Sequence, residues 1–239
     1  MRTGGLHKFS LIDYPGKISA VVFTQGCNFR CPYCHNPGLV YPAMFSSPVP
    51  EQDVLSFLSR RKGLIDGVVI TGGEPLLLQG LAEFIRAVKD MGFVVKLDTN
   101  GSRPAALEEL LKARLPDYIA VDYKAPLRIY HRVAGTGVDT GAIISSVNAV
   151  TGSGIPYEIR TTLFSGLGRE DISEMIMELQ LMKTENYFLQ AFKPYADCRE
   201  DLAPLEVNAE HLYKSLCGFS RYGIRNISKE EQYHHVCHR

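Results

Sequence analysis

The distribution of apolar residues along the chain predicts short strands that alternate with amphipathic helices. Short runs rich in β-branched residues indicate strands, and apolar residues three or four positions apart indicate helices. The predicted strands are residues 18–24, 68–71, 94–97, 118–122, 157–163 and 187–192. The predicted helices are residues 52–61, 75–91, 105–115, 143–150, 171–182 and 209–219.

Six strand–helix units in regular order favour a parallel sheet with right-handed helical crossovers. Eight such units would close a full barrel, so six predict a partial parallel (β/α)6 barrel of the α/β class. We expect a single domain over residues 1–239, because no low-complexity or linker-like segment interrupts the pattern. Residues 1–17 would form a short lead-in, and residues from about 228 to 239 a C-terminal tail.

Charge and hydropathy narrow the range of partners and compartments. Lys plus Arg and Asp plus Glu each number 26, so no net charge attracts nucleic acid or an anionic membrane. No apolar run approaches the roughly 20 residues that span a bilayer. The N-terminus does not resemble a signal peptide. We therefore expect a cytoplasmic protein with reduced cysteines and no nucleic-acid or membrane partner.

Three cysteines lie close together directly after the first predicted strand. Cys27, Cys31 and Cys34 form the pattern C-x3-C-x2-C. Thiolates are soft ligands that suit an iron–sulfur cluster or zinc. A cubane cluster is normally held by four cysteines, so three would leave one iron open to another ligand. The remaining cysteines lack ligand spacing and are expected to be core or surface thiols. They are Cys198, Cys217 and Cys237.

The same loop permits other interpretations. Cys31-Pro32-Tyr33-Cys34 matches the dithiol of glutaredoxins, and Cys31 to His35 matches the C-x-x-C-H attachment site of c-type haem. A Cys3His zinc site that includes His35 is a further alternative, although we expect His35 to pack in the loop. Haem attachment requires export, and the glutaredoxin motif leaves Cys27 unexplained. On the loop alone, zinc is therefore the strongest of these alternatives.

Polar residues follow the next predicted strands, where a parallel sheet would gather them at one rim. The second strand is followed by Gly72-Gly73-Glu74-Pro75, the third by Asp98-Thr99-Asn100-Gly101, and the end of the fourth by Asp122-Tyr123-Lys124. Two glycines let the backbone approach a ligand closely. Glu74 adds a carboxylate that could accept a hydrogen bond from an ammonium group. The later strands contribute Arg160, Gln190 and Lys193.

Together these segments resemble the radical S-adenosylmethionine (SAM) enzymes. The cysteine loop, with Tyr33 before its third cysteine, and the Gly72-Gly73-Glu74 segment resemble two motifs of that superfamily. The segments beginning at Asp98 and Asp122 resemble those of glycyl-radical-enzyme activating enzymes, such as the activases of pyruvate formate-lyase. Residues 10–16 resemble the lead-in segment of the same activating enzymes, and residues 23–37 are similar to the activating proteins of anaerobic ribonucleoside-triphosphate reductases.

The resemblance implies which residues hold the cofactors. Cys27, Cys31 and Cys34 would be the catalytic ligands of a [4Fe–4S] cluster whose open iron binds SAM. Asp98 and Asp122 would share a monovalent cation, because neighbouring carboxylates repel without one. The residues implied to bind SAM are Tyr33, Gly72, Gly73, Glu74, Asp98, Asn100 and Lys124.

The resemblance also implies an activity and its partners. A radical SAM activase reductively cleaves SAM at its cluster and generates a glycyl radical on a partner enzyme. Its electron donor would be a protein such as flavodoxin or ferredoxin. The motifs favour anaerobic ribonucleoside-triphosphate reductase as the partner, whereas the chain length suits a pyruvate formate-lyase activase better. The alternatives are a small-molecule radical SAM enzyme, such as a carboxydeazaguanine synthase, and a non-catalytic zinc-binding module.

Overall fold

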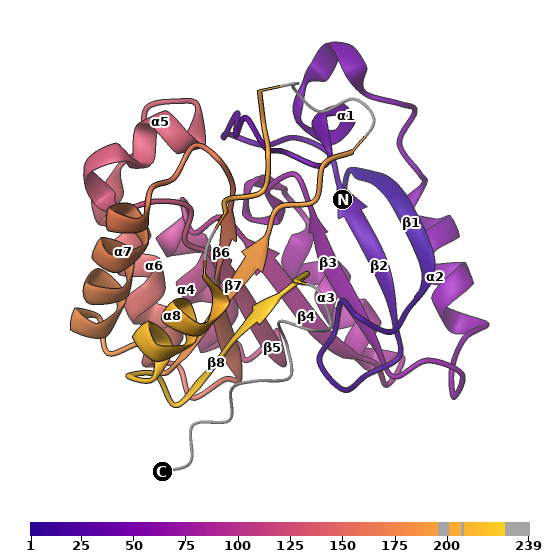
Figure 1. Ribbon diagram of the computed structural model, residues 1–239. Helices are drawn as coiled ribbons and strands as arrows, with labels where there is room; N and C mark the ends of the chain where they lie inside the picture. The colour runs from indigo at the N-terminus through magenta and orange to yellow at the C-terminus, as the bar shows by residue number, and fades with distance from the viewer. Residues whose placement is uncertain (196–200, 207, 228–239) are drawn as a thin grey trace.

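The computed structural model describes residues 1–195, 201–206 and 208–227 (Figure 1). Its centre is one eight-stranded sheet with the strands in sequence order. Strands β2 to β8 are parallel, and β1 is antiparallel to β2. The strands are β1 (Thr3–Ser10), β2 (Ser19–Thr24), β3 (Gly67–Gly72), β4 (Val94–Thr99), β5 (Tyr118–Asp122), β6 (Tyr157–Leu163), β7 (Asn186–Ala191) and β8 (Arg221–Arg225).

Helices cover the outer face of the curved sheet, and α1 and α5 lie at its upper rim (Figure 1). No helix in the described part of the chain is long and apolar enough to cross a membrane. The α-helices are α1 (Pro37–Val40), α2 (Glu51–Ser59), α3 (Leu81–Asp90), α4 (Pro104–Lys112), α5 (Tyr130–Ala134), α6 (Thr140–Thr151), α7 (Arg169–Leu181) and α8 (Ala209–Leu216).

The α/β class and all six predicted strands are confirmed, but the sheet is larger than predicted. Strand β1 lies within the predicted lead-in, and β8 follows the last predicted helix. Both are edge strands, and their sequences, TGGLHKFS and RYGIR, lack a continuous apolar run. Edge strands commonly carry polar residues, so hydrophobic pattern identifies them poorly.

The helix predicted to begin at Pro75 begins six residues later in the structure. A short 3-10 helix, Pro75–Leu77, comes first, and its Leu76 amide donates to the Glu74 side chain. Gly80 then adopts a left-handed conformation with φ of 80°, and α3 begins at Leu81. The proline correctly marked a helical turn, but the glycine separates that turn from the long helix.

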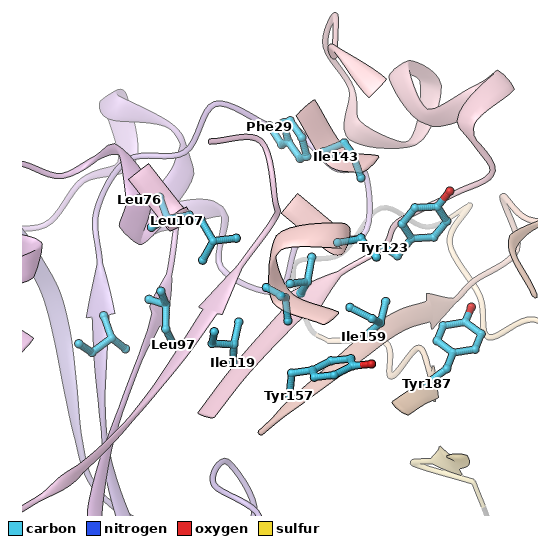
Figure 2. Close-up of a cluster of buried hydrophobic side chains, with 14 of the residues drawn as sticks. Phe29, Leu76, Leu97, Leu107, Ile119, Tyr123, Ile143, Tyr157, Ile159 and Tyr187 are labelled. Atoms are coloured by element: carbon cyan, nitrogen blue, oxygen red, sulfur yellow. The ribbon is translucent and has the colours of Figure 1, made fainter. Parts of the chain in front are cut away.

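The main apolar core lies between the sheet and its helices. Alternate residues of a strand point to opposite faces, so one set of positions packs outward against the helices. Figure 2 shows Leu97, Ile119 and Ile159 from three neighbouring strands together with Leu107 and Ile143 from two helices. All five are fully buried.

The intervening positions on the same strands carry charges, and they face the inside of the curve. Lys96 and Asp98 are two residues apart on β4, and Glu158 and Arg160 are two apart on β6. The strand register pairs Arg160 with Asp122 of β5. The inside of the sheet is therefore polar where its strands end, which is where the motifs of the sequence converge.

Candidate functional site

One cavity of about 300 Å³ at the carboxyl ends of the strands collects most of the predicted site residues. Cys27, Cys31 and Cys34 line it from the loop after β2. The opposite wall comes from the ends of β3 to β7. Its residues include Thr71, Gly72, Gly73, Asp98, Thr99, Asn100, Asp122, Lys124, Arg160, Thr162 and Gln190. The cavity therefore joins three soft thiol ligands to a wall of polar and charged groups.

The start of the cysteine loop contacts Gly73 and Glu74, which directly follow β3. The Gly73 amide donates to Thr24 O at 2.9 Å, and the Glu74 amide donates to Gly26 O at 2.8 Å. A Cβ added to Gly73 would lie 2.0 Å from Gly26 O, so only glycine allows this approach. Because Gly26 immediately precedes Cys27, the contact fixes where the first thiol begins.

Helix α5, which was not predicted, holds the same loop from the other side. The Arg30 amide donates to Ala134 O at 2.7 Å. The Arg30 guanidinium donates back to Cys27 O at 2.6 Å. Gly135 ends the helix with φ of 68°, and a Cβ there would lie 2.2 Å from Arg30 O. The cysteine loop therefore has two fixed contacts, one with Gly73 after β3 and one with the end of α5.

Glu74 joins the ends of β3 and β4. Its carboxylate is fully buried and accepts from the Leu76 amide at 3.1 Å, Thr99 Oγ1 at 2.7 Å and the Asn100 amide at 2.6 Å. Burial raises the pKa of Glu74 to about 7 despite these donors. Both oxygens already have protein partners, so contact with an ammonium group stays a prediction.

Replacing Glu74 with Gln is expected to remove a pH dependence of stability. The folded pKa of about 7 lies above the ordinary 4.5, so folding favours the protonated carboxyl. This stabilisation is complete below about pH 4.5 and is lost as the pH rises through about 7, a change of up to about 3 kcal/mol. Urea unfolding at about pH 5 and about pH 8 would measure it. Equal losses of stability in wild type and Glu74→Gln would contradict this role.

Asn100 contacts the cysteine loop directly. Its side-chain amide donates to Asn28 Oδ1 at 3.0 Å and lies 3.8 Å from Cys27 Sγ. Asn28 in turn donates to Ser102 Oγ at 2.9 Å. The sequence did not lead us to predict a role for Asn28. Its position between Cys27 and Cys31 was the feature that could have indicated one. These amides connect the first thiol to the end of β4.

Lys124 supplies positive charge beneath the thiols. It is 9% exposed, and its Nζ lies 5.9 Å from the centre of the Tyr33 ring and 3.4 Å from Asp122 Oδ2. Burial raises the pKa of Cys27, Cys31 and Cys34, and the charge of Lys124 offsets part of this rise. A buried ammonium therefore favours the thiolate forms that bind metals.

Arg160 lies between the two predicted cation ligands. It donates to Asp98 Oδ2 at 3.3 Å and to Asp122 Oδ1 at 2.9 and 3.0 Å. Burial raises the pKa of Asp122, but Arg160 and Lys124 outweigh burial and hold that pKa at about 2. The Asp122 carboxylate is therefore ionised, and the Arg160 guanidinium joins it to Asp98.

Two further charged residues of the inner face were missed. Lys96 donates to Asp98 Oδ1 at 2.5 Å, and Glu158 pairs with Arg225 at 2.5 Å. Lys96 precedes Asp98 by two positions, and Glu158 precedes Arg160 by two positions. Charged residues at alternate positions of otherwise apolar strands were the signal that could have found them. Arg225 lies on the unpredicted strand β8.

The remaining candidates lie outside this charged wall. His35 Nε2 donates to Lys193 O at 3.0 Å, and its ring packs against Phe192 and Tyr195. Cys217 ends α8, and Cys198, Cys237 and the tail lie outside the described residues. Within the described part of the chain, no three His, Cys, Asp or Glu side chains form a single-ion site.

Comparison with known proteins places these features in a family. Residues 21–179 match the radical SAM superfamily. A glycyl-radical enzyme activating enzyme of Methanocaldococcus jannaschii is 32% identical over 93% of this chain and 93% of its own. A GTP 3′,8-cyclase of Thermococcus kodakarensis is 27% identical over 90% of this chain and 76% of its own. The pyruvate formate-lyase-activating enzyme of Clostridium pasteurianum is 34% identical over 52% of each chain.

Solved structures show the same fold at lower sequence identity. Streptococcus suis SuiB bound to the precursor peptide SuiA superposes with a TM-score of 0.67. The superposition covers 86% of this chain and 48% of that one, with 14% identity. At this identity the likeness establishes the shared fold alone.

Proposed function

Because this chain belongs to the radical SAM superfamily, we propose that it is an activase that generates a glycyl radical on a partner enzyme. The observation that carries this proposal is the match to a glycyl-radical enzyme activating enzyme over 93% of both chains. A match of that extent leaves no large part of either protein outside the comparison. The identity to a pyruvate formate-lyase-activating enzyme points to the same activity.

Enzymes of this superfamily use a [4Fe–4S] cluster and SAM, and the residues of the cavity suit both. Cys27, Cys31 and Cys34 provide three soft ligands on one loop, which we assign to three irons of the cluster. Lys124 favours their thiolate forms. Held by these three thiols, a reduced cluster would supply the electron for reductive cleavage of SAM, the chemistry needed to remove a hydrogen atom from the partner's glycine.

The chain's own residues would position SAM against the cysteine loop. Gly72 and Gly73 line the cavity with backbone alone, so a ligand can lie close to the strand ends. Asn100 and Tyr33 also line it. Lys124 and Arg160 give its wall positive charge that suits an anionic group. We assign these residues, together with Asp98 in the same wall and the buried Glu74 next to Gly73, to SAM binding.

The open sheet supports a protein substrate. Among the described strands, β1 and β8 are the two edges, and they do not pair with each other. A peptide accompanies the SuiB structure of the same fold. For this chain we propose a glycine-bearing loop of an anaerobic ribonucleoside-triphosphate reductase, on the motifs around the cysteines. We also propose a flavodoxin or ferredoxin as electron donor, in the cytoplasm.

Anaerobic mixing of reduced enzyme, SAM and anaerobic ribonucleoside-triphosphate reductase is expected to produce a glycyl radical. The signal would be a doublet in electron paramagnetic resonance, and changing the partner's radical glycine to Ala should abolish it. A doublet on pyruvate formate-lyase alone would reassign the partner. Turnover of a purified nucleotide or pterin without any protein would replace the activase proposal with small-molecule chemistry.

A further inference from the structure

The chain itself neutralises the two carboxylates that were predicted to share a monovalent cation. Asp98 Oδ1 accepts from Lys96 Nζ at 2.5 Å, and Asp98 Oδ2 accepts from Arg160 at 3.3 Å. Asp122 Oδ1 accepts twice from Arg160, at 2.9 and 3.0 Å, and Asp122 Oδ2 accepts from Lys124 at 3.4 Å. Each of the four oxygens therefore has a donor that carries positive charge.

The charge of the surrounding groups does not favour an additional cation. Lys96, Arg160 and Lys124 contact Asp98 and Asp122, and Arg160 also lies 3.7 Å from Glu158. Glu158 is itself paired with Arg225 on β8 at 2.5 Å, so the four cations of this network face three carboxylates, which leaves one positive charge in excess. A metal ion between the two aspartates would approach three fixed cations and displace a hydrogen-bond donor from any carboxylate oxygen that it bound.

Arg160 is held where such an ion would lie. The strand register places it directly beside Asp122, and its side chain is 13% exposed. A guanidinium is planar, keeps its charge at any ordinary pH, and can bridge two carboxylates. Burial lowers the pKa of Arg160, but Asp122, Asp98 and Glu158 raise it further than burial lowers it. Arg160 therefore keeps its positive charge between the two carboxylates.

We propose that Arg160 takes the place of the monovalent cation, so that this enzyme binds SAM without potassium or sodium between Asp98 and Asp122. The proposal rests on the proposed function only for the position of these aspartates beside SAM. A covalently attached cation cannot dissociate, so its charge does not depend on the concentration of potassium in the cell. The resemblance to the activases therefore extends to the two aspartates but not to the ion they were expected to hold.

The test compares salts at equal ionic strength. Cluster-loaded protein, purified anaerobically, is transferred to potassium chloride, sodium chloride or choline chloride. The thermal midpoint and the affinity for SAM, read from the cluster's spectrum, are expected to be the same in all three. A wild-type midpoint about 2–4 °C higher in potassium or sodium than in choline would overturn the proposal. A shift of this size is expected when a stabilising ion is present at roughly five times its Kd.

Three variants separate charge from packing. Arg160→Gln is expected to acquire a rise of about 2–4 °C in potassium or sodium over choline, because its aspartates lose their shared cation. Arg160→Lys retains a positive charge and should show no such rise. Arg128→Gln is the matched control, since Arg128 also joins two carboxylates, Asp171 and Glu174, but its side chain is 51% exposed. It should not respond to the cation.

The salt-dependence measurements test the role of Arg160 independently of whether the protein has activase activity. A folded Arg160→Gln protein without any cation response would contradict the proposal that Arg160 fills the position of an ion. If that variant does not fold, the comparison of salts on the wild-type protein still tests the proposal. The thermal comparison requires no partner enzyme and no SAM cleavage. Failure to generate a glycyl radical would therefore refute the proposed function and leave the result for Arg160 standing.

Discussion

Replacing any one of Cys27, Cys31 and Cys34 with Ala is expected to abolish reductive SAM cleavage. The three thiols line one cavity, and no other cysteine lines it in the described part of the chain. Loss of one ligand leaves a cubane cluster with two, so the iron content should fall from about four per chain towards zero. Iron and sulfide analysis after anaerobic purification would measure the loss before any activity assay.

Cys217→Ala provides the matched control for this loss. The Cys217 thiol lies at the end of α8, 3.4 Å from Tyr213 O. It does not line the cavity, so the variant should retain its iron and cleave SAM. Loss of the cluster from Cys217→Ala, with retention in a variant of the loop, would refute the ligand assignment.

Gly73→Ala is expected to destabilise the protein by about 3 kcal/mol or more and to impair cluster assembly. The new methyl group would lie 2.0 Å from Gly26 O, and backbone atoms cannot move aside as a flexible side chain can. The loop must shift next to Cys27, and the hydrogen bond from the Glu74 amide to Gly26 O is strained. Urea unfolding and iron content would together report both effects.

Gly137→Ala tests whether the methyl group itself is the cause. A Cβ at Gly137 would meet no atom within 4 Å. Its stability should therefore change by less than about 0.5 kcal/mol. If both variants lost the same stability, the close approach of Gly73 to Gly26 would not be the reason for the glycine.

The fold could be predicted from the sequence where one face of each strand packs against helices. Leu97, Ile119 and Ile159 belong to runs whose apolar residues marked β4, β5 and β6. The edge strands gave no such signal, because β1 and β8 each have a neighbour on one side only. Gly80 shows a second limit of prediction from apolar pattern. Its left-handed backbone separates the turn at Pro75–Leu77 from helix α3, although the apolar pattern runs through both.

The position of the site could be predicted because parallel strands bring their carboxyl ends together. The cysteines and the segments after β3, β4 and β5 meet at one cavity, as expected. The partner of each side chain could not be predicted. Arg160 was expected at this rim without a stated partner, and it lies 2.9 Å from Asp122, because strand register across 38 residues of sequence decides this pairing. Glu74 likewise holds Thr99 and Asn100 through contacts that no local pattern encodes.

The order of the strands bears on how the chain folds as it emerges from the ribosome. Since β1 to β8 are neighbours in sequence order, each new strand can pair with one already made, and long loops need not close first. The glycines that seat the cysteine loop come early. Arg160 arrives later, on β6. In a nascent chain the cysteine loop can therefore form first. Arg160, which joins Asp98 to Asp122, is synthesised only after both aspartates.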